Sequence, residues 1–152
     1  MPTYYSDRTK AVLAGNTSTY PPARGDGRGL INQAFSFTVD TALLVNDVVQ
    51  LVKVPAGAII LDLLVASGGT QGANSDSNVL IGDGSDTDRY VASASGTILR
   101  SGGGFVRLTA LTGVNYQYTD EDTIDLVVGT VGTGQTTGGY VKGWVNYRIG
   151  GN

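Results

Sequence analysis

Clusters of glycine divide this chain into short segments, and their spacing limits the folds open to it. The sequence contains 23 glycines in 152 residues. From Phe35 onward, the stretches between these clusters alternate apolar and polar side chains, and no convincing long helix interrupts the pattern. A period of two places every second side chain on one face, which is typical of a half-buried β-strand. We therefore predict an all-β domain.

The expected strands are separated by turns such as Pro55-Ala56-Gly57. The strongest is Ala58–Ala66, with Ile59, Leu61, Leu63 and Val65 on one face and Ile60, Asp62 and Leu64 on the other. Because both faces are largely apolar, we expect both to be covered. The other expected segments are 35–40, Val48–Val54, Val79–Gly82, Arg89–Ala92, Thr97–Arg100, Phe105–Thr109, Val114–Thr119, Thr123–Gly129 with Ile124, Leu126 and Val128 inward, and Tyr140–Ile149 with Val141, Val145, Tyr147 and Ile149 on one face.

About eight strands at this regular spacing predict a jelly-roll-type antiparallel β-sandwich over residues 35–152. An immunoglobulin-like sandwich is the alternative.

Residues 1–34 differ from this body and are predicted to form an extended N-terminal arm. A short helical turn over Asp7–Ala14 is compatible with Ser6 as its N-cap and Gly15 as its stop. Residues 16–29 have little apolar content and no period. Residues 1–30 carry four basic and two acidic side chains, a net charge of +2, in a chain whose total is −3. That excess is too weak for a genome-binding arm, and we expect no nucleic-acid partner.

The composition excludes several kinds of chemistry. Without cysteine there is no disulfide, thiol nucleophile or thiolate metal site, and without histidine there is no Ser-His-Asp triad or ordinary zinc site. The carboxylates lie in polar turns, apart from Asp62, which we expect to face a basic side chain on a neighbour. No apolar run approaches the roughly 20 residues that cross a membrane, and the N-terminus lacks a secretory signal. We predict a non-enzymatic protein without a cofactor, made in a cytoplasm and not bound to a membrane.

Two motifs in polar loops have a functional and a plain structural interpretation. Arg24-Gly25-Asp26 matches the integrin-type tripeptide, but three residues in a glycine-rich loop carry little information. Asp83, Asp86 and Asp88 offer oxygen ligands for calcium, although their spacing departs from the EF-hand loop. A turn in which aspartates bind nearby backbone N–H groups is favoured. Asp120-Glu121-Asp122, with Asp125 following, is interpreted as a second, solvated acidic turn.

The last strand has a face that deserves a functional hypothesis. Tyr140, Lys142, Trp144 and Arg148 share it. Exposed aromatic rings with cations bind sugars or another subunit. Cover by the arm or by the second sheet is the equal alternative.

Several turn-and-strand patterns resemble small structural proteins of tailed bacteriophages. They are Val52-Lys53-Val54-Pro55-Ala56-Gly57-Ala58-Ile59-Ile60, Ile81-Gly82-Asp83-Gly84-Ser85-Asp86-Thr87-Asp88-Arg89-Tyr90, Thr123-Ile124-Asp125-Leu126 and Gly139-Tyr140-Val141. The resemblance covers roughly residues 50–148. It implies a head decoration (cement) protein, or a related virion surface protein, with a jelly-roll-like fold and no catalytic residues.

This resemblance implies a place on the capsid surface of a virion, with the major capsid protein as partner. A homo-oligomer is expected because a β domain without disulfides gains stability by burying apolar surface between copies, and a trimer suits a capsid three-fold position. The arm is the expected capsid contact, through Tyr4, Tyr5, Arg8, Lys10, Arg24 and Arg28. A carbohydrate- or receptor-binding module of a phage tail or fibre is the alternative. A single-jelly-roll coat protein is disfavoured by the weakly basic arm.

Overall fold

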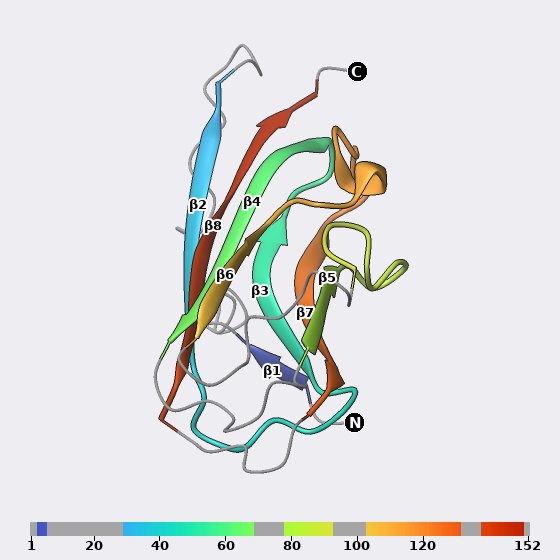
Figure 1. Ribbon diagram of the computed structural model, residues 1–152. Helices are drawn as coiled ribbons and strands as arrows, with labels where there is room; N and C mark the ends of the chain where they lie inside the picture. Colours follow the sequence, from blue (N-terminus) through green and yellow to red (C-terminus); the bar gives the residue numbers. More distant parts are fainter. Residues whose placement is uncertain (1–2, 6–28, 69–77, 93–102, 132–137, 151–152) are drawn as a thin grey trace.

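The computed structural model describes residues 3–5, 29–68, 78–92, 103–131 and 138–150, and these form a β-sandwich (Figure 1). One four-stranded sheet has the order β1-β3-β7-β5 and is called here the β7 sheet; the other has the order β2-β8-β4-β6 and is called the β8 sheet. The strands are β1 (Thr3–Tyr5), β2 (Ile31–Thr38), β3 (Val48–Val54), β4 (Ala58–Gly68), β5 (Asn78–Gly82), β6 (Gly104–Arg107), β7 (Asp122–Thr130) and β8 (Tyr140–Ile149). Every pairing is antiparallel except that of β1 with β3.

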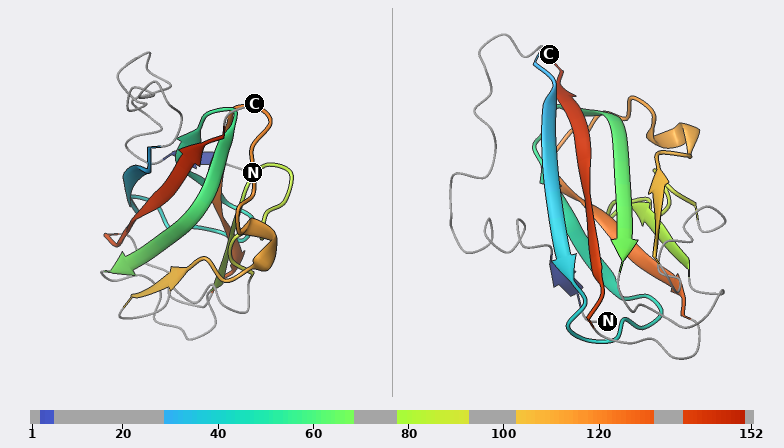
Figure 2. Two further views of the ribbon diagram at one scale, coloured as in Figure 1. Left: turned by 90° about the horizontal axis from the view of Figure 1, so that it is seen from above. Right: turned by 60° about the vertical axis from the view of Figure 1, so that its left-hand side comes forward.

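The strand order confirms the predicted jelly-roll type. From β2 to β8, successive strands alternate between the two sheets, so the chain winds around the core (Figure 2). In an immunoglobulin-like sandwich the first two strands share a sheet, and so do the last two. That alternative is therefore wrong. The predicted strand Arg89–Ala92 is reduced to a single bridge between Val91 and Ile81, beside β5.

The core lies between the two sheets and follows the alternation of the sequence. Ile124, Leu126 and Val128 of β7 are fully buried, as predicted. On the opposite sheet, the inward side chains of β8 are buried while their neighbours are exposed or half-buried. The predicted inward set from the first segment is also buried, namely Phe35, Phe37 and Val39.

A β-bulge in β4 overturns the predicted faces of that strand. The pairing of β4 with β8 shifts between Ile60 and Asp62, which makes Leu61 an extra residue. A bulge reverses the side of every residue that precedes it. Ile60 therefore points into the core together with Leu63 and Val65, whereas Leu61 is exposed and Ile59 is half-buried. The outer side of β4 is only partly covered.

The predicted strand Val114–Thr119 is reduced to a single antiparallel bridge between Gln117 and Ile59 of β4. A 3-10 helix, Leu111–Gly113, comes first, and the irregular loop after it runs alongside β4. Asn115 has a left-handed backbone with φ of 58°. The loop exchanges backbone hydrogen bonds with β4, including Asn115 N to Ile60 O at 3.1 Å and Tyr118 N to Ala58 O at 2.9 Å. Its alternating tyrosines serve a polar cluster described below rather than one face of a strand.

The sandwich begins earlier than the alternation indicated. β2 starts at Ile31, and its polar Gln33 is buried because its side chain bonds Lys53 O at 3.4 Å and accepts from Tyr147 Oη at 3.1 Å. Thr3–Tyr5, from the predicted arm, forms a strand of the β7 sheet. The predicted helical turn Asp7–Ala14, residues 16–28 and the strand Thr97–Arg100 lie outside the described residues. The described part of the chain contains no helix long and apolar enough to cross a membrane.

Candidate functional site

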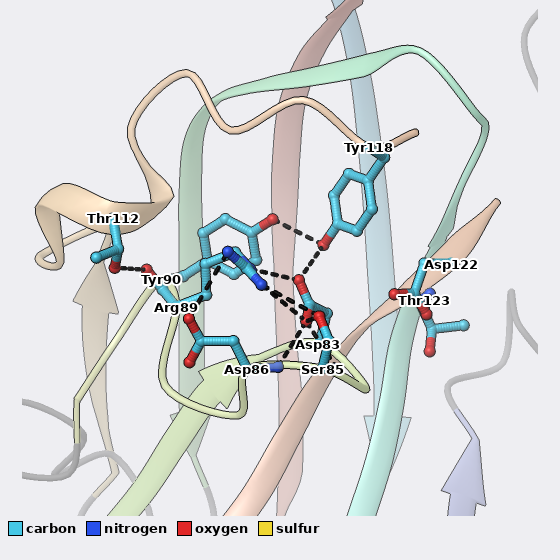
Figure 3. A network of polar contacts seen from close by, with 9 residues as sticks. All are labelled: Asp83, Ser85, Asp86, Arg89, Tyr90, Thr112, Tyr118, Asp122 and Thr123. Atoms are coloured by element: carbon cyan, nitrogen blue, oxygen red, sulfur yellow. Dashed lines mark hydrogen bonds and ion pairs between the residues drawn. The ribbon is translucent and has the colours of Figure 1, made fainter. Parts of the chain in front are cut away.

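A buried aspartate organises the end of the sandwich where β3 turns into β4. Asp83 follows β5, and its carboxylate accepts hydrogen bonds from Ser85 N at 3.0 Å, Ser85 Oγ at 2.8 Å, Asp86 N at 2.9 Å and Arg89 Nε at 2.6 Å (Figure 3). Tyr118 Oη donates a fifth at 3.3 Å. Burial acts to raise the pKa of Asp83, but the bonds from Arg89, Ser85 and Asp86 outweigh it and hold the pKa below its ordinary value.

Arg89 is held on several sides. Its guanidinium carbon lies 3.7 Å from the centroid of the Tyr116 ring, and its Nη1 lies 3.7 Å from Asp86 Oδ2. Burial acts to lower the pKa of Arg89, and the carboxylate of Asp83 more than offsets it, so the guanidinium stays charged. Because these protein donors surround Asp83, the favoured polar-turn interpretation is confirmed. Among the described residues, no three or more histidines, cysteines or carboxylates are grouped so as to hold a metal ion.

Two tyrosines complete this arrangement. Tyr90 Oη donates to Tyr118 Oη at 2.7 Å, and both side chains are buried. Burial raises the pKa of each phenol well above its ordinary value, so both hydroxyls keep their protons and remain donors. Tyr116 meets the Tyr118 ring edge-on, with centroids 5.0 Å apart. We call Asp83, Arg89, Tyr90, Tyr116 and Tyr118 the end cluster. Its donors and acceptors satisfy one another, which is the arrangement of a structural lock rather than of an acid–base pair.

Asp125 lies in the predicted strand Thr123–Gly129, but its carboxylate is buried rather than solvated as the acidic-turn interpretation expected. It lies within β7, opposite Gln50 and Gly82, and its Oδ1 has no hydrogen-bond partner among the described residues. Burial raises its pKa to about 7; a hydrogen bond from Thr123 opposes the shift, and the charges of Asp122 and Asp83 add to it. Its position between Ile124 and Leu126 was the only signal that it belongs to a strand.

The predicted face on β8 lies on the outer side of the β8 sheet. Tyr140, Lys142 and Trp144 stand at alternate positions of the strand, and Arg148 continues the series. Cover by the second sheet is excluded, because that sheet packs against the opposite side, where Val145 is buried. Trp144 is half-buried between Ala34 of β2 and Leu64 of β4 in the register.

Two residues of β6 extend this face, and the sequence analysis did not single them out. Phe105 is 72% exposed. Arg107 pairs with Asp62 at 2.7 Å, as expected for that carboxylate, and its guanidinium carbon lies 5.6 Å from the Trp144 ring centroid. Lys142 Nζ lies 4.5 Å from the centroid of Tyr140. We call Tyr140, Lys142, Trp144, Arg148, Phe105 and Arg107 the β8 outer face; exposed rings beside cations are suited to contact with another molecule.

The structure describes two of the six predicted arm contacts. Tyr4 pairs with Val49 in register and packs its ring 6.1 Å from that of Phe37. Burial raises the pKa of Tyr4, and the nearby charge of Asp47 adds to the shift. Tyr5 pairs with Gln50 through the strand register. The remaining four, Arg8, Lys10, Arg24 and Arg28, and with them Arg24-Gly25-Asp26, lie outside the described residues.

The sequence matches no protein-family model and no curated relative. Its fold is similar to chains in three bacteriophage capsid structures. A chain in the capsid of Ralstonia phage GP4 matches with a TM-score of 0.79 and 16% identity, covering 99% of this chain and 100% of that one. A chain in the capsid asymmetric unit of cyanophage Pam1 matches with a TM-score of 0.70 and 19% identity, over 86% and 92%. A chain in the acid-stable capsid of Helicobacter pylori bacteriophage KHP30 gives 0.54 and 16%, over 79% and 87%. At such identities the similarity establishes a shared fold.

Proposed function

We propose that this protein is a non-enzymatic structural component of a bacteriophage virion that decorates and stabilises the capsid. The observation that carries the proposal is the match over essentially the full length of both chains with a chain in the Ralstonia phage GP4 capsid. The sequence patterns at 52–60 and 81–90 support the same class of protein.

The polar chemistry of the described residues supports a structural role. The buried carboxylate of Asp83 is surrounded by protein donors, so no vacant oxygen faces a substrate. The phenols of Tyr90 and Tyr118 hold their protons. An enzyme needs a group poised to exchange a proton near neutral pH; Asp125 has a pKa of about 7, but its carboxylate is buried within a strand.

We further propose a homotrimer that contacts the major capsid protein through basic residues of the N-terminal segment. Arg8, Lys10, Arg24 and Arg28 supply the basic excess of an otherwise acidic chain, and such charges steer a protein toward an acidic shell. Because Tyr4 packs on the body of the sandwich, it serves better as the anchor of this segment than as a capsid contact.

Co-sedimentation with phage shells purified without this protein tests the proposal. The intact protein is expected to bind at hundreds of copies per shell, and the shells are expected to resist heat better once decorated. A variant with Arg8, Lys10, Arg24 and Arg28 all replaced by glutamine should bind more weakly. The matched control replaces Lys142 and Arg148 of β8 in the same way. Failure of the intact protein to bind any shell contradicts the decoration role.

The second candidate is a carbohydrate- or receptor-binding module of a phage tail or fibre. The observation that favours it is the β8 outer face, where Phe105 is exposed and Lys142 and Arg107 stand beside aromatic rings. A glycan-binding screen with the intact protein and Trp144→Ala separates the two. Saturable glycan binding that Trp144→Ala abolishes, together with only a few copies per virion, would favour the module.

A further inference from the structure

The loop tip Leu111–Val114 presents an apolar side chain to solvent more openly than any other described part of the chain. Leu111 is 89% exposed, the highest value among the exposed large hydrophobic side chains of the described residues, and Val114 beside it is also exposed. Single exposed apolar residues are common on protein surfaces. This pair differs from such isolated residues in that the backbone of the tip is held firmly in place.

The tip is anchored on its inner side by polar contacts and close packing. Thr112 Oγ1 donates to Arg89 O at 2.9 Å, and Gly113 lies so close to the Tyr90 ring that no Cβ fits there. Within the tip, Val114 N donates to Leu111 O at 3.2 Å. On its far side, the left-handed Asn115 donates its N–H to Ile60 O of β4 at 3.1 Å. The backbone of the tip is therefore fixed at both ends and in the middle.

The end cluster stands directly behind these anchors. Arg89, whose carbonyl accepts the hydrogen bond from Thr112, is itself held by the carboxylate of Asp83 (Figure 3). The Tyr116 ring packs against its guanidinium. Neither Leu111 nor Val114 contributes a side chain to this lock, so the cluster orders a loop whose outward groups are apolar and left in water. An anchor that is rigid before binding loses little entropy on docking.

The surroundings of the tip indicate the charge of its partner. Asp86 flanks Arg89 on the side where Thr112 attaches (Figure 3), and the exposed Asp88 immediately precedes Arg89. The cation of Arg89 is largely buried and paired with Asp83. The loop that holds the tip on this side therefore carries more acidic than basic side chains, and an apolar anchor beside an acidic loop fits an apolar pocket that is bordered by lysine or arginine.

We propose that Leu111 and Val114 form a docking knob that inserts into an apolar, basic-rimmed pocket on another protein of the shell. This inference rests on the proposed capsid role and adds to it a contact within the sandwich itself. The end cluster then has a function beyond stability, since it holds the knob in the orientation that the pocket requires.

The test measures binding of the full chain to shells that lack it. Leu111→Asp is expected to weaken binding about tenfold or more, because it places a carboxylate in an apolar pocket. Leu44→Asp is the matched control, since Leu44 is 61% exposed in a different loop, and it should bind within about twofold of the intact protein. Thr112→Val keeps the knob apolar but removes its anchor, so an intermediate loss is expected. Thermal melts establish that each variant is folded.

The outcomes separate this inference from the proposed function. If the intact protein does not bind shells at all, the capsid role fails. If it binds and Leu111→Asp binds equally well, only the docking knob is overturned. If Leu111→Asp binds shells normally but loses self-association in light scattering, the tip contacts a second copy of this chain, which also overturns a pocket on another shell protein.

Discussion

The end cluster and the β8 outer face use the same three chemical groups with opposite exposure. In the end cluster, Arg89 pairs with Asp83 at 2.6 Å and stacks on Tyr116, and its side chain is 13% exposed. On the β8 outer face, Arg107 pairs with Asp62 at 2.7 Å and lies beside Trp144, yet it is 55% exposed. When buried, a carboxylate, a guanidinium and a ring thus satisfy one another and stabilise the fold. When exposed, the same groups stay available for contact with a partner. The pair geometry alone does not distinguish the two roles.

The largest expected difference between the two regions is in the cost of losing the carboxylate. Asp83→Ala removes the main ionic partner of the largely buried Arg89 and the acceptor of the Ser85 and Asp86 backbone N–H groups, and we expect a loss of about 3–5 kcal/mol in the free energy of unfolding. Asp62→Ala, at the exposed pair, should cost about 0–1 kcal/mol. Urea denaturation of both variants measures this. Equal losses would remove the distinction between lock and open face.

Close packing behind the loop tip gives the next largest effect. A Cβ at Gly113 meets the Tyr90 ring and Arg89 O, so Gly113→Ala should cost about 1–3 kcal/mol. Gly84 lies at the same end of the sandwich, but its nearest contact for a Cβ is Asp122 Oδ1 at 3.9 Å. Gly84→Ala should stay within about 0.5 kcal/mol of the parent. Similar thermal midpoints for the two variants would show that the tip is not packed as described.

A buried carboxylate without a cation sharpens the comparison through its pH dependence. The pKa of Asp125 is raised from 3.8 to about 7, so the folded state holds a proton that the unfolded state releases. Its contribution to stability is complete below about pH 4 and is lost as the pH rises through 7. Asp83, whose pKa is lowered, contributes in the opposite direction and loses its contribution as the pH falls below its ordinary range.

Asp125→Asn should therefore be more stable than the parent by about 1–2 kcal/mol at pH 8, and the two should converge near pH 3. Denaturation series across this range measure the difference, with the exposed Asp88→Asn as control. Parallel curves for the parent and Asp125→Asn would contradict the buried, protonated carboxylate.

The smallest effect on stability is expected on the β8 outer face. Because Phe105 is largely exposed, Phe105→Ser should change the free energy of unfolding by no more than about 0.5 kcal/mol. Binding assays with shells and with glycans then show whether the face has a partner. A loss of several kcal/mol instead would mean that Phe105 supports the sandwich.

Prediction from the sequence succeeds here where a side chain's role depends on its own strand. The alternation across Tyr140–Ile149 predicts both the bounds of β8 and its two faces, because each position simply follows the pleat. It fails at Leu61, where one extra residue reverses the faces of the preceding residues without any mark in the local pattern. The jelly-roll type was accessible from strand number and spacing, but the positions of bulges were not.

The candidate sites show the same division. The turn at Asp83 and the shared face of Tyr140, Lys142 and Trp144 follow from neighbouring residues. Burial of Gln33 depends on Tyr147, which lies 114 positions away in the sequence. Tyr118 likewise finds Tyr90 only after the chain has crossed between sheets. Such polar partners are set by tertiary packing, and no periodicity in the sequence predicts them.

The position of β8 has a consequence for how the protein is made. This late strand lies between β2 and β4 and pairs with both along most of its length. Until Tyr140–Ile149 has left the ribosome, β2 and β4 lack their common neighbour. The β8 sheet then cannot form, and the apolar side chains on its inner side stay uncovered. A nascent chain stopped before this point should stay open and recruit chaperones. The sandwich is therefore expected to fold only after β8 has been synthesised.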